Sequence, residues 1–288
     1  MSGPLRAGRL VPVLALSVVT ALWGSTFVIS KGALERMAPL ELLSWRFALA
    51  AGVMVVIRPT ALVAVPRRVW RGGVLLGVLY GSAQIPQYIG LTGTTAATSG
   101  FLIGTYVVFT PLLGSVFLRT RSPVTTYVGV LLAAAGLGVF SFDGLRLEWG
   151  EALSLVAAVL YAGHIVAMGR WSTPGDAWVL TTIQMITIAV VLGIPALTLG
   201  LPPPSHPVDW WAILWLAVIA GALAIGVQTW AQSRIPATHA AVIMAAEPLW
   251  AAMFAVGFGG EELGVRLLLG GALLLAANLT IAATGRAA

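Results

Sequence analysis

The ionisable side chains that lie far inside apolar stretches are where this sequence is most expected to do chemistry. Glu247 lies near the middle of the apolar stretch Thr238–Phe258. A charged carboxylate at the centre of a bilayer costs about 2.5–3.5 kcal/mol, so such a residue usually faces a cavity or a partner. Glu247 is therefore predicted to bind a proton or a substrate ammonium group. The alternative is a neutral or paired glutamate that braces a helix break at Pro248, because proline frees a backbone carbonyl.

His164 and Arg46 are the other two candidates for a proton or charge site. His164 lies in the apolar stretch Gly150–Gly169 and titrates near neutral pH, so it is either a proton relay or a neutral side chain bonded to a backbone carbonyl. Arg46 lies roughly 9 Å inside the stretch Leu40–Ile57, by helical rise. It either holds a substrate carboxylate through its two parallel N–H groups or extends to the bilayer surface.

Amide and aromatic side chains within the apolar stretches predict a cavity. Tyr80, Gln84, Gln87 and Tyr88 are spaced to share one face of a helix, and Gln228 lies in a later stretch. Amides facing lipid are unfavourable, so these faces should point inward, where the alternative is interhelical hydrogen bonding worth about 0.6 kcal/mol each. The predicted substrate-binding cavity comprises Trp23, Tyr80, Gln84, Tyr88, Tyr106, Tyr161, His164, Gln228, Met244 and Glu247.

The composition is that of a chain dissolved in lipid. The sequence is 59% hydrophobic and 9% charged, and its mean hydropathy is +0.95. Soluble domains carry roughly 25% charged residues, so a water-soluble globule is excluded. The absence of cysteine excludes thiol catalysis and cysteine-ligated metals, and the three histidines are not spaced as a metal site. The sequence therefore predicts an all-α integral membrane protein with no metal site.

Ten apolar stretches between charged positions are long enough to cross a bilayer. They are Leu10–Ser30, Leu40–Ile57, two between Arg71 and Arg119 that meet at a turn over Gly90–Thr94, Val124–Phe140, Gly150–Gly169, Ala177–Leu199, Trp210–Ser233, Thr238–Phe258 and Leu263–Thr284. Only short loops remain between them, which leaves no room for a catalytic domain outside the membrane.

The basic residues predict the orientation. With the N-terminus in the cytoplasm, eleven of the sixteen lysine and arginine residues fall on the cytoplasmic side and four on the other. This asymmetry favours cytoplasmic N- and C-termini in a multi-pass protein of the cell inner (plasma) membrane. It also explains a pI near 10.5 by contact with the bilayer and without a nucleic-acid partner.

An internal repeat near an offset of 138 residues divides the chain into two halves, 1–145 and 146–288. The offset places Ala21–Thr26 over Val159–His164 and Arg46 over Gln184, and an offset of 137 places Phe109–Leu112 over Ala246–Leu249. Each half holds five predicted helices, and because five is odd the second half must be inverted. Inverted repeats are usual in secondary transporters, with the substrate near the midplane.

Three prolines and a stripe of small residues add to this architecture. Pro86, Pro111 and Pro248 are predicted to interrupt the third, fourth and ninth helices, and broken helices indicate a binding region. Gly129 and Ala133 have small-residue spacing that suits a helix contact, including one between two copies of the chain in a homodimer.

Several of these residues resemble one transporter family. The motif Ala21–Phe27, the arginine at Arg46, and Glu247-Pro248 followed by a Gly-rich last helix resemble the EamA-type transporters of the drug/metabolite transporter superfamily, in particular YddG-like amino-acid and metabolite exporters. The resemblance implies ten helices in two inverted halves, no cofactor and export of small metabolites. The sequence departs from the family pattern in one place. The family often has a glutamate in the turn after the fourth helix, and Leu118–Ser122 lacks it, whereas Gly260–Glu262 after the ninth helix partly keeps it.

The expected function is therefore that of a secondary transporter rather than an enzyme. It is expected to move small metabolites, with amino acids the first candidates, by alternating access, and its partners are the substrate and the lipid bilayer. No phosphate-binding G-x-x-x-x-G-K-[ST] motif occurs, so ATP does not drive it directly. The alternative is an integral-membrane enzyme or a flippase that acts on a lipid-linked substrate.

Overall fold

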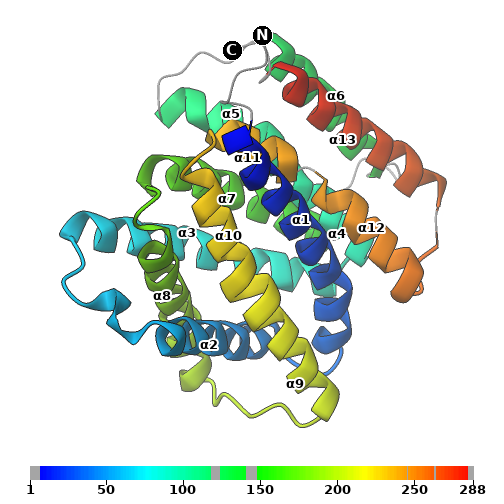
Figure 1. Cartoon of the computed structure of the whole chain (residues 1–288). Helices are drawn as coiled ribbons and strands as arrows, with labels where there is room; N and C mark the ends of the chain where they lie inside the picture. The colour runs from blue at the N-terminus through cyan, green and yellow to red at the C-terminus, as the bar shows by residue number, and fades with distance from the viewer. Residues whose placement is uncertain (1–6, 118–123, 141–147, 245, 263, 285–288) are drawn as a thin grey trace.

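In the computed structural model, residues 7–117, 124–140, 148–244, 246–262 and 264–284 are described, and every regular element in them is helical (Figure 1). The elements are α1 (Ala7–Leu34), α2 (Pro39–Ile57), the 3-10 helix η1 (Pro59–Leu62), α3 (Arg67–Thr92), α4 (Ala96–Gly104), α5 (Tyr106–Phe117), α6 (Val124–Phe140), α7 (Trp149–Trp171), α8 (Ala177–Thr198), α9 (Pro207–Leu214), the π-helix η2 (Trp215–Leu223), α10 (Ala224–Gln232), α11 (Ala237–Met244), α12 (Glu247–Phe258) and α13 (Val265–Thr284). The predicted all-α class is confirmed.

Six helical segments are long and apolar enough to cross a membrane. They are Leu10–Leu34, Pro39–Ile57, Ala96–Phe117, Trp149–Trp171, Ala177–Thr198 and Pro207–Gln232. The other expected spans correspond to α3, which is long but carries arginines and glutamines, and to α6, α11–α12 and α13, which are shorter or less uniformly apolar. The structure thus confirms several spans, and the count of ten stays a prediction.

Helix packing has an internal two-fold pattern. If α1, α2, α3, α4–α5 and α6 are exchanged for α7, α8, α9–α10, α11–α12 and α13, most of the major packing pairs map onto another pair or onto themselves. The packing of α1 on α12 matches that of α7 on α4 and α5, and the packing of α3 on α7 matches that of α10 on α1. The pairs α2–α8 and α6–α13 map onto themselves, and α6 lies along α13 at the edge of the bundle (Figure 1). Within the chain α6 therefore already has a helix partner, and a contact between protomers stays a prediction.

Two of the expected spans are broken, and not where all three prolines predict. α4 ends at Gly104, with Thr105 between it and α5, and α11 ends at Met244 before α12, which begins at Glu247 with Pro248 in its first turn. Pro86 lies inside the unbroken α3, and Pro111 lies inside α5, so these two predictions are wrong. A proline removes one backbone hydrogen bond, and a helix surrounded by other helices continues past that loss.

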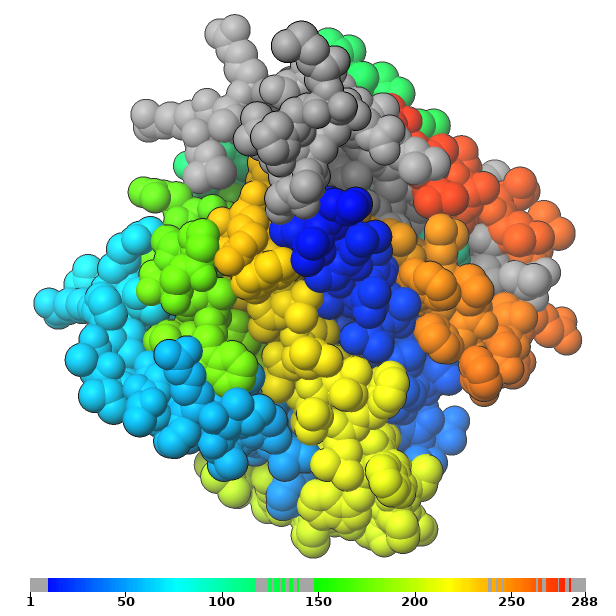
Figure 2. Space-filling view, in the orientation of Figure 1, coloured from blue at the N-terminus to red at the C-terminus, as the bar shows by residue number. Residues whose placement is uncertain are grey.

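The surface of the helices is apolar. Large side chains such as Val56, Phe117, Leu197 and Phe258 are more than two-thirds exposed. Figure 2 shows α1 beside the segment from α9 to α10 across one face of the molecule. An apolar surface this widespread is costly in water and suits a lipid environment.

Close packing where the broken segments cross depends on glycine. A Cβ added to Gly104, at the end of α4, would lie 2.3 Å from Cγ of Pro248. Gly100 and Gly24 meet Ala251 and Trp250 of α12 at similarly short range. The rigid proline ring cannot move aside, so α4 and α12 approach this closely only because position 104 has no side chain.

We predict that Gly104→Ala lowers the stability of the protein by about 1–3 kcal/mol, the usual cost of overpacking. Thermal unfolding in detergent measures the change. The control is Gly114→Ala in α5, where an added Cβ meets nothing within 4 Å and which should be neutral or slightly stabilising. Equal effects of the two substitutions would contradict the packing argument.

Candidate functional site

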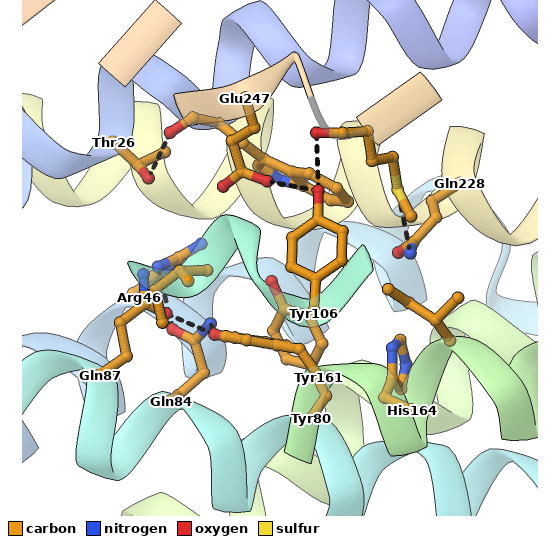
Figure 3. A pocket seen from close by; sticks show the side chains of 14 residues that line it. Thr26, Arg46, Tyr80, Gln84, Gln87, Tyr106, Tyr161, His164, Gln228 and Glu247 are labelled. Atoms are coloured by element: carbon orange, nitrogen blue, oxygen red, sulfur yellow. Dashed lines mark hydrogen bonds between the residues drawn. The ribbon is translucent and has the colours of Figure 1, made fainter. Parts of the chain in front are cut away.

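A cavity with about 490 Å³ of atom-free space, open solvent included, lies among helices from both halves of the chain (Figure 3). Its lining comes from α1, α2, α3, α4–α5, α7, α10, α11 and α12. The lining residues are Trp23, Thr26, Arg46, Tyr80, Gln84, Gln87, Ile103, Tyr106, Tyr161, His164, Ile165, Gln228, Met244 and Glu247. All but one of the predicted cavity residues lie on it, together with Arg46.

Arg46 is 2% exposed and is surrounded by neutral acceptors. Its Nε donates to the carbonyl of Leu216 at 3.1 Å, and Nη1 donates to Gln84 Oε1 at 3.2 Å and to the hydroxyl of Tyr88. The guanidinium carbon lies 4.8 Å from the centre of the Phe47 ring, within the range of a cation–π contact. No described carboxylate lies within ion-pair distance of Arg46, so its charge is solvated but not neutralised.

A guanidinium can only donate hydrogen bonds, so Arg46 sets the donor and acceptor roles of the side chains bonded to it in sequence. The side-chain oxygen of Gln84 faces Arg46, so the Gln84 amide nitrogen donates to the hydroxyl of Tyr161. That hydroxyl in turn donates to Gln87 Oε1. Arg46 thereby fixes the orientation of a polar wall built from α3 and α7.

Tyr88 does not line the cavity, which corrects its prediction as a cavity residue. Its ring is 2% exposed, and its hydroxyl accepts from Arg46 and lies 2.9 Å from Ser30 Oγ. Tyr88 shares the helical face of Gln84, but its hydroxyl is bonded to the Arg46 guanidinium and its side chain does not line the cavity. Its contact is with the charged residue rather than with the cavity.

Glu247 lies at the point where the two broken segments meet. The hydroxyl of Tyr106, the first residue of α5, lies 2.6 Å from the carbonyl of Met244 and 3.2 Å from Glu247 Oε2. Because Glu247 opens α12, the positive end of that helix favours its carboxylate. No hydrogen bond from the described residues reaches the second carboxylate oxygen, and in Figure 3 the side chain faces the cavity above Arg46.

His164 is 1% exposed and is held by a chain of three side chains. Its Nε2 lies 3.0 Å from Gln184 Oε1, and Gln184 Nε2 lies 3.5 Å from Thr229 Oγ1. The Thr229 hydroxyl donates to the carbonyl of Ile225, so it accepts from Gln184. The partner of His164 is therefore a side chain, whereas one interpretation from sequence was a backbone carbonyl.

The π-helix η2 supplies acceptors to two cavity residues. Trp23 Nε1 donates to the carbonyl of Ala220 at 3.0 Å, and Arg46 Nε donates to that of Leu216. π-helical turns occur often at functional sites, since their carbonyls are less regularly paired. η2 thus anchors one cavity residue from α1 and one from α2.

Four lining residues were missing from the predicted set: Thr26, Gln87, Ile103 and Ile165. Gln87 had a usable signal, since it lies one turn from Gln84 on the same face of α3. Thr26 belongs to the motif near the start of the chain. The two isoleucines had no signal, because apolar residues in an apolar helix do not reveal which way they face.

Membrane-length helices around a cavity that exposes buried polar side chains form an architecture typical of solute transporters. Two stretches of the sequence, residues 10–142 and 148–283, match the EamA-like transporter family. The chain belongs to the EamA-like transporter family, and it is a multi-span membrane protein that carries the family domain twice.

Individual relatives agree with this assignment. An uncharacterized transporter of Archaeoglobus fulgidus is 27% identical over 95% of this chain and 86% of its own. The uncharacterized inner membrane transporter YedA of Escherichia coli is 24% identical over 90% of this chain and 87% of its own. An S-adenosylmethionine/S-adenosylhomocysteine transporter of Chlamydia trachomatis is 28% identical over 52% of this chain and 48% of its own. A solved structure with a TM-score of 0.72 and 18% identity covers 96% of this chain and 99% of its own, which shows a shared fold.

We predict that Tyr106→Phe destabilises the protein by about 1–3 kcal/mol, because the buried carbonyl of Met244 and the carboxyl of Glu247 lose a hydrogen-bond partner. Thermal unfolding measures the change. Tyr127→Phe on the exposed side of α6 is the control and should leave the melting temperature unaltered. If the two variants unfold alike, the Tyr106 hydroxyl does not hold the broken segments together.

Proposed function

We propose that this protein is a secondary transporter of zwitterionic small metabolites, with amino acids as the substrate class. The observation that carries the proposal is a cavity lined by one cation and one carboxyl group that are not paired with each other. Arg46 and Glu247 both line it, and no ion pair joins them. Unpaired charges in a medium of low polarity are costly, and a ligand with a carboxylate and an ammonium group supplies a partner to each.

The remaining donors and acceptors fit this assignment. Among the described residues no acceptor is bonded to Arg46 Nη2, so this nitrogen is left to donate to a substrate carboxylate. The free oxygen of Glu247 is left for an ammonium group. A proton competes for the same carboxylate, so Glu247 is also the proposed proton site, with His164 as a second ionisable group on the cavity wall.

The proposed transport cycle is alternating access by two inverted halves, 1–145 and 146–288. The reciprocal packing of the helices supports it, because a two-fold related pair of halves can rock about a site that lies between them. The distribution of basic residues supports cytoplasmic termini in a bacterial inner membrane. Export is the direction that the resemblance to metabolite exporters suggests. The relatives named as transporters favour transport over catalysis or lipid flipping.

One end of the bundle is joined across the two halves by polar contacts. Arg36, in the turn after α1, donates to Asp209 Oδ1 from Nη2 at 2.6 Å and from Nε at 2.9 Å. The hydrogen bond to Asp209 raises the pKa of Arg36, which favours its protonated, charged form. At the same end the carboxylate of Glu261, after α12, accepts from the N–H groups of Ala96 and Ala97 that open α4. We infer that these contacts latch this end, the outer end in the proposed orientation, and that they open during transport.

We predict that Arg46 binds the carboxylate of the ligand and Glu247 its ammonium group, and that the two contacts can be lost independently. L-Tyrosine, tyrosinamide and N-acetyltyrosine share a side chain but carry both charges, only the ammonium, or only the carboxylate. Arg46→Met should weaken tyrosine and N-acetyltyrosine at least ~10-fold and spare tyrosinamide, whereas Glu247→Gln should weaken tyrosine and tyrosinamide and spare N-acetyltyrosine. Ligand-dependent shifts in melting temperature measure the affinities.

Arg234→Met and Glu262→Gln are the matched controls, since both residues are exposed and neither lines the cavity. Uptake into proteoliposomes, with and without a pH gradient, tests transport of a panel of amino acids, with S-adenosylmethionine included because of the chlamydial relative. Absence of saturable uptake of every compound would overturn the proposed function.

The latch makes a separate prediction that needs no substrate. The chain contains no cysteine, so Thr26→Cys places a unique thiol on the cavity wall. An impermeant maleimide added on the Arg36 side should label it slowly, and Glu261→Gln should speed this labelling several-fold, because the anion at the α4 N-terminus is lost. Glu262→Gln should not. Equal labelling rates in the two variants would show that Glu261 does not hold this end closed.

A further inference from the structure

Gln228 reaches the cavity with its amide poorly paired. Its side chain is 2% exposed, and Nε2 lies 3.6 Å from the thioether sulfur of Met244, which is a weak acceptor. Oε1 is buried and has no hydrogen-bond partner. If the amide oxygen and nitrogen of Gln228 were exchanged, the oxygen would lie next to the Met244 sulfur and the nitrogen would have no hydrogen-bond partner. Buried polar groups are normally paired, so an amide left in this state next to a cavity indicates a missing ligand group.

His164 offers a second free acceptor at the same end. Gln184 donates to Thr229, so its oxygen faces His164 and accepts from Nε2–H. In the neutral ring this leaves Nδ1 as an acceptor, and no hydrogen bond from the described residues reaches it. Gln228 and His164 both line the cavity. Figure 3 shows Gln228 and His164 on the side of the cavity away from Arg46 and Gln84.

The cavity wall also has an apolar and aromatic part. Ile103, Ile165 and Met244 line the cavity and offer no strong hydrogen-bonding group from their side chains. In Figure 3 the rings of Tyr106, Tyr161 and Tyr80 lie between Arg46 and Gln228, so a ligand held at Arg46 and Glu247 by its charged groups extends past these rings before it reaches Gln228. The far end accepts hydrogen bonds, and the groups that satisfy it are donors.

We propose that Gln228, with His164 Nδ1 beside it, selects substrates whose side chain ends in an N–H or O–H donor. This inference rests on the proposed function, because the zwitterion anchored at Arg46 and Glu247 directs the side chain toward Gln228. Amide, phenol and indole side chains are the matching classes. Hydrocarbon side chains of the same shape leave both acceptors unpaired and are disfavoured, as in sites built to bond a substrate hydroxyl or amide.

Three isosteric pairs test the proposal: asparagine against leucine, glutamine against methionine, and tyrosine against phenylalanine. Melting-temperature shifts of the purified protein over a range of ligand concentrations measure each affinity. The protein should bind the donor-bearing member about 10-fold more tightly in each pair that fits the cavity. Gln228→Leu should reduce this preference to about 2-fold or reverse it.

Gln232→Leu is the matched control. Gln232 lies one turn along α10, is 3% exposed and also has an unpaired Oε1, but its Nε2 donates to the carbonyl of Ile165 and it does not line the cavity. Its substitution should leave the preference intact. Gln228→Met provides a second variant of nearly the same length, with which the ratio is measured should the leucine variant fail to fold.

The outcomes separate the two proposals. Equal binding of both members of each pair, or a preference that survives loss of the Gln228 amide, overturns the selectivity inference and leaves the zwitterion site standing. An equal loss of preference in Gln232→Leu also overturns it, because the effect would then be structural. Absence of binding by every amino acid overturns the proposed function and this inference together.

Discussion

A charged guanidinium held inside an apolar bundle by neutral partners is the constraint on which the rest of the site depends. Arg46 has no carboxylate partner among the described residues, so backbone and side-chain oxygens and the Phe47 ring stabilise its charge. The oxygen acceptors have to be placed by two elements other than α2. The carbonyl comes from the π-helix η2, and the side-chain acceptors come from α3. Packing of α2 against both is therefore a consequence of solvating one charge away from water.

The second organising feature is the crossing of two broken segments. α5 and α12 each begin after a break in an expected span, and their first residues, Tyr106 and Glu247, are in contact. The close approach of α4 and α12 needs Gly104 opposite Pro248. These breaks bring helix ends, with their free backbone groups, to the cavity. The sequence offset of 138 pairs Arg46 with the neutral Gln184, which bonds to His164, so the two matching stretches carry different chemistry.

Much of the site was predictable from sequence because lipid makes polar residues expensive. Arg46, Gln84, His164, Gln228 and Glu247 stood out against apolar surroundings, and all of them line one cavity. The failures have the same origin. Ile103 and Ile165 resemble lipid-facing residues in sequence, so nothing distinguished them.

Helix breaks were less predictable than polar positions. Proline in a sequence predicts a helix interruption, but a helix buried among others continues through Pro86 and Pro111, while a break occurs at Thr105 without a proline. The π-helix also had no signal, since its sequence is apolar throughout, and its geometry depends on bonds to Trp23 and Arg46 from other helices. Such features arise from tertiary contacts rather than from local preference.

The proposed substrate class also follows from charge balance during transport. With Glu247 ionised, the cavity holds one positive and one negative group, and a zwitterion adds no net charge. The empty and the loaded carrier then have the same net charge, so neither change of state needs to carry a charge through the membrane potential, which costs about 2.3 kcal/mol per charge per 100 mV. A cationic or anionic ligand would lose this balance unless a proton bound or left Glu247. The same carboxyl group that completes the zwitterion site therefore gives the carrier a means of accepting ligands of other charge, at the cost of coupling their movement to protons.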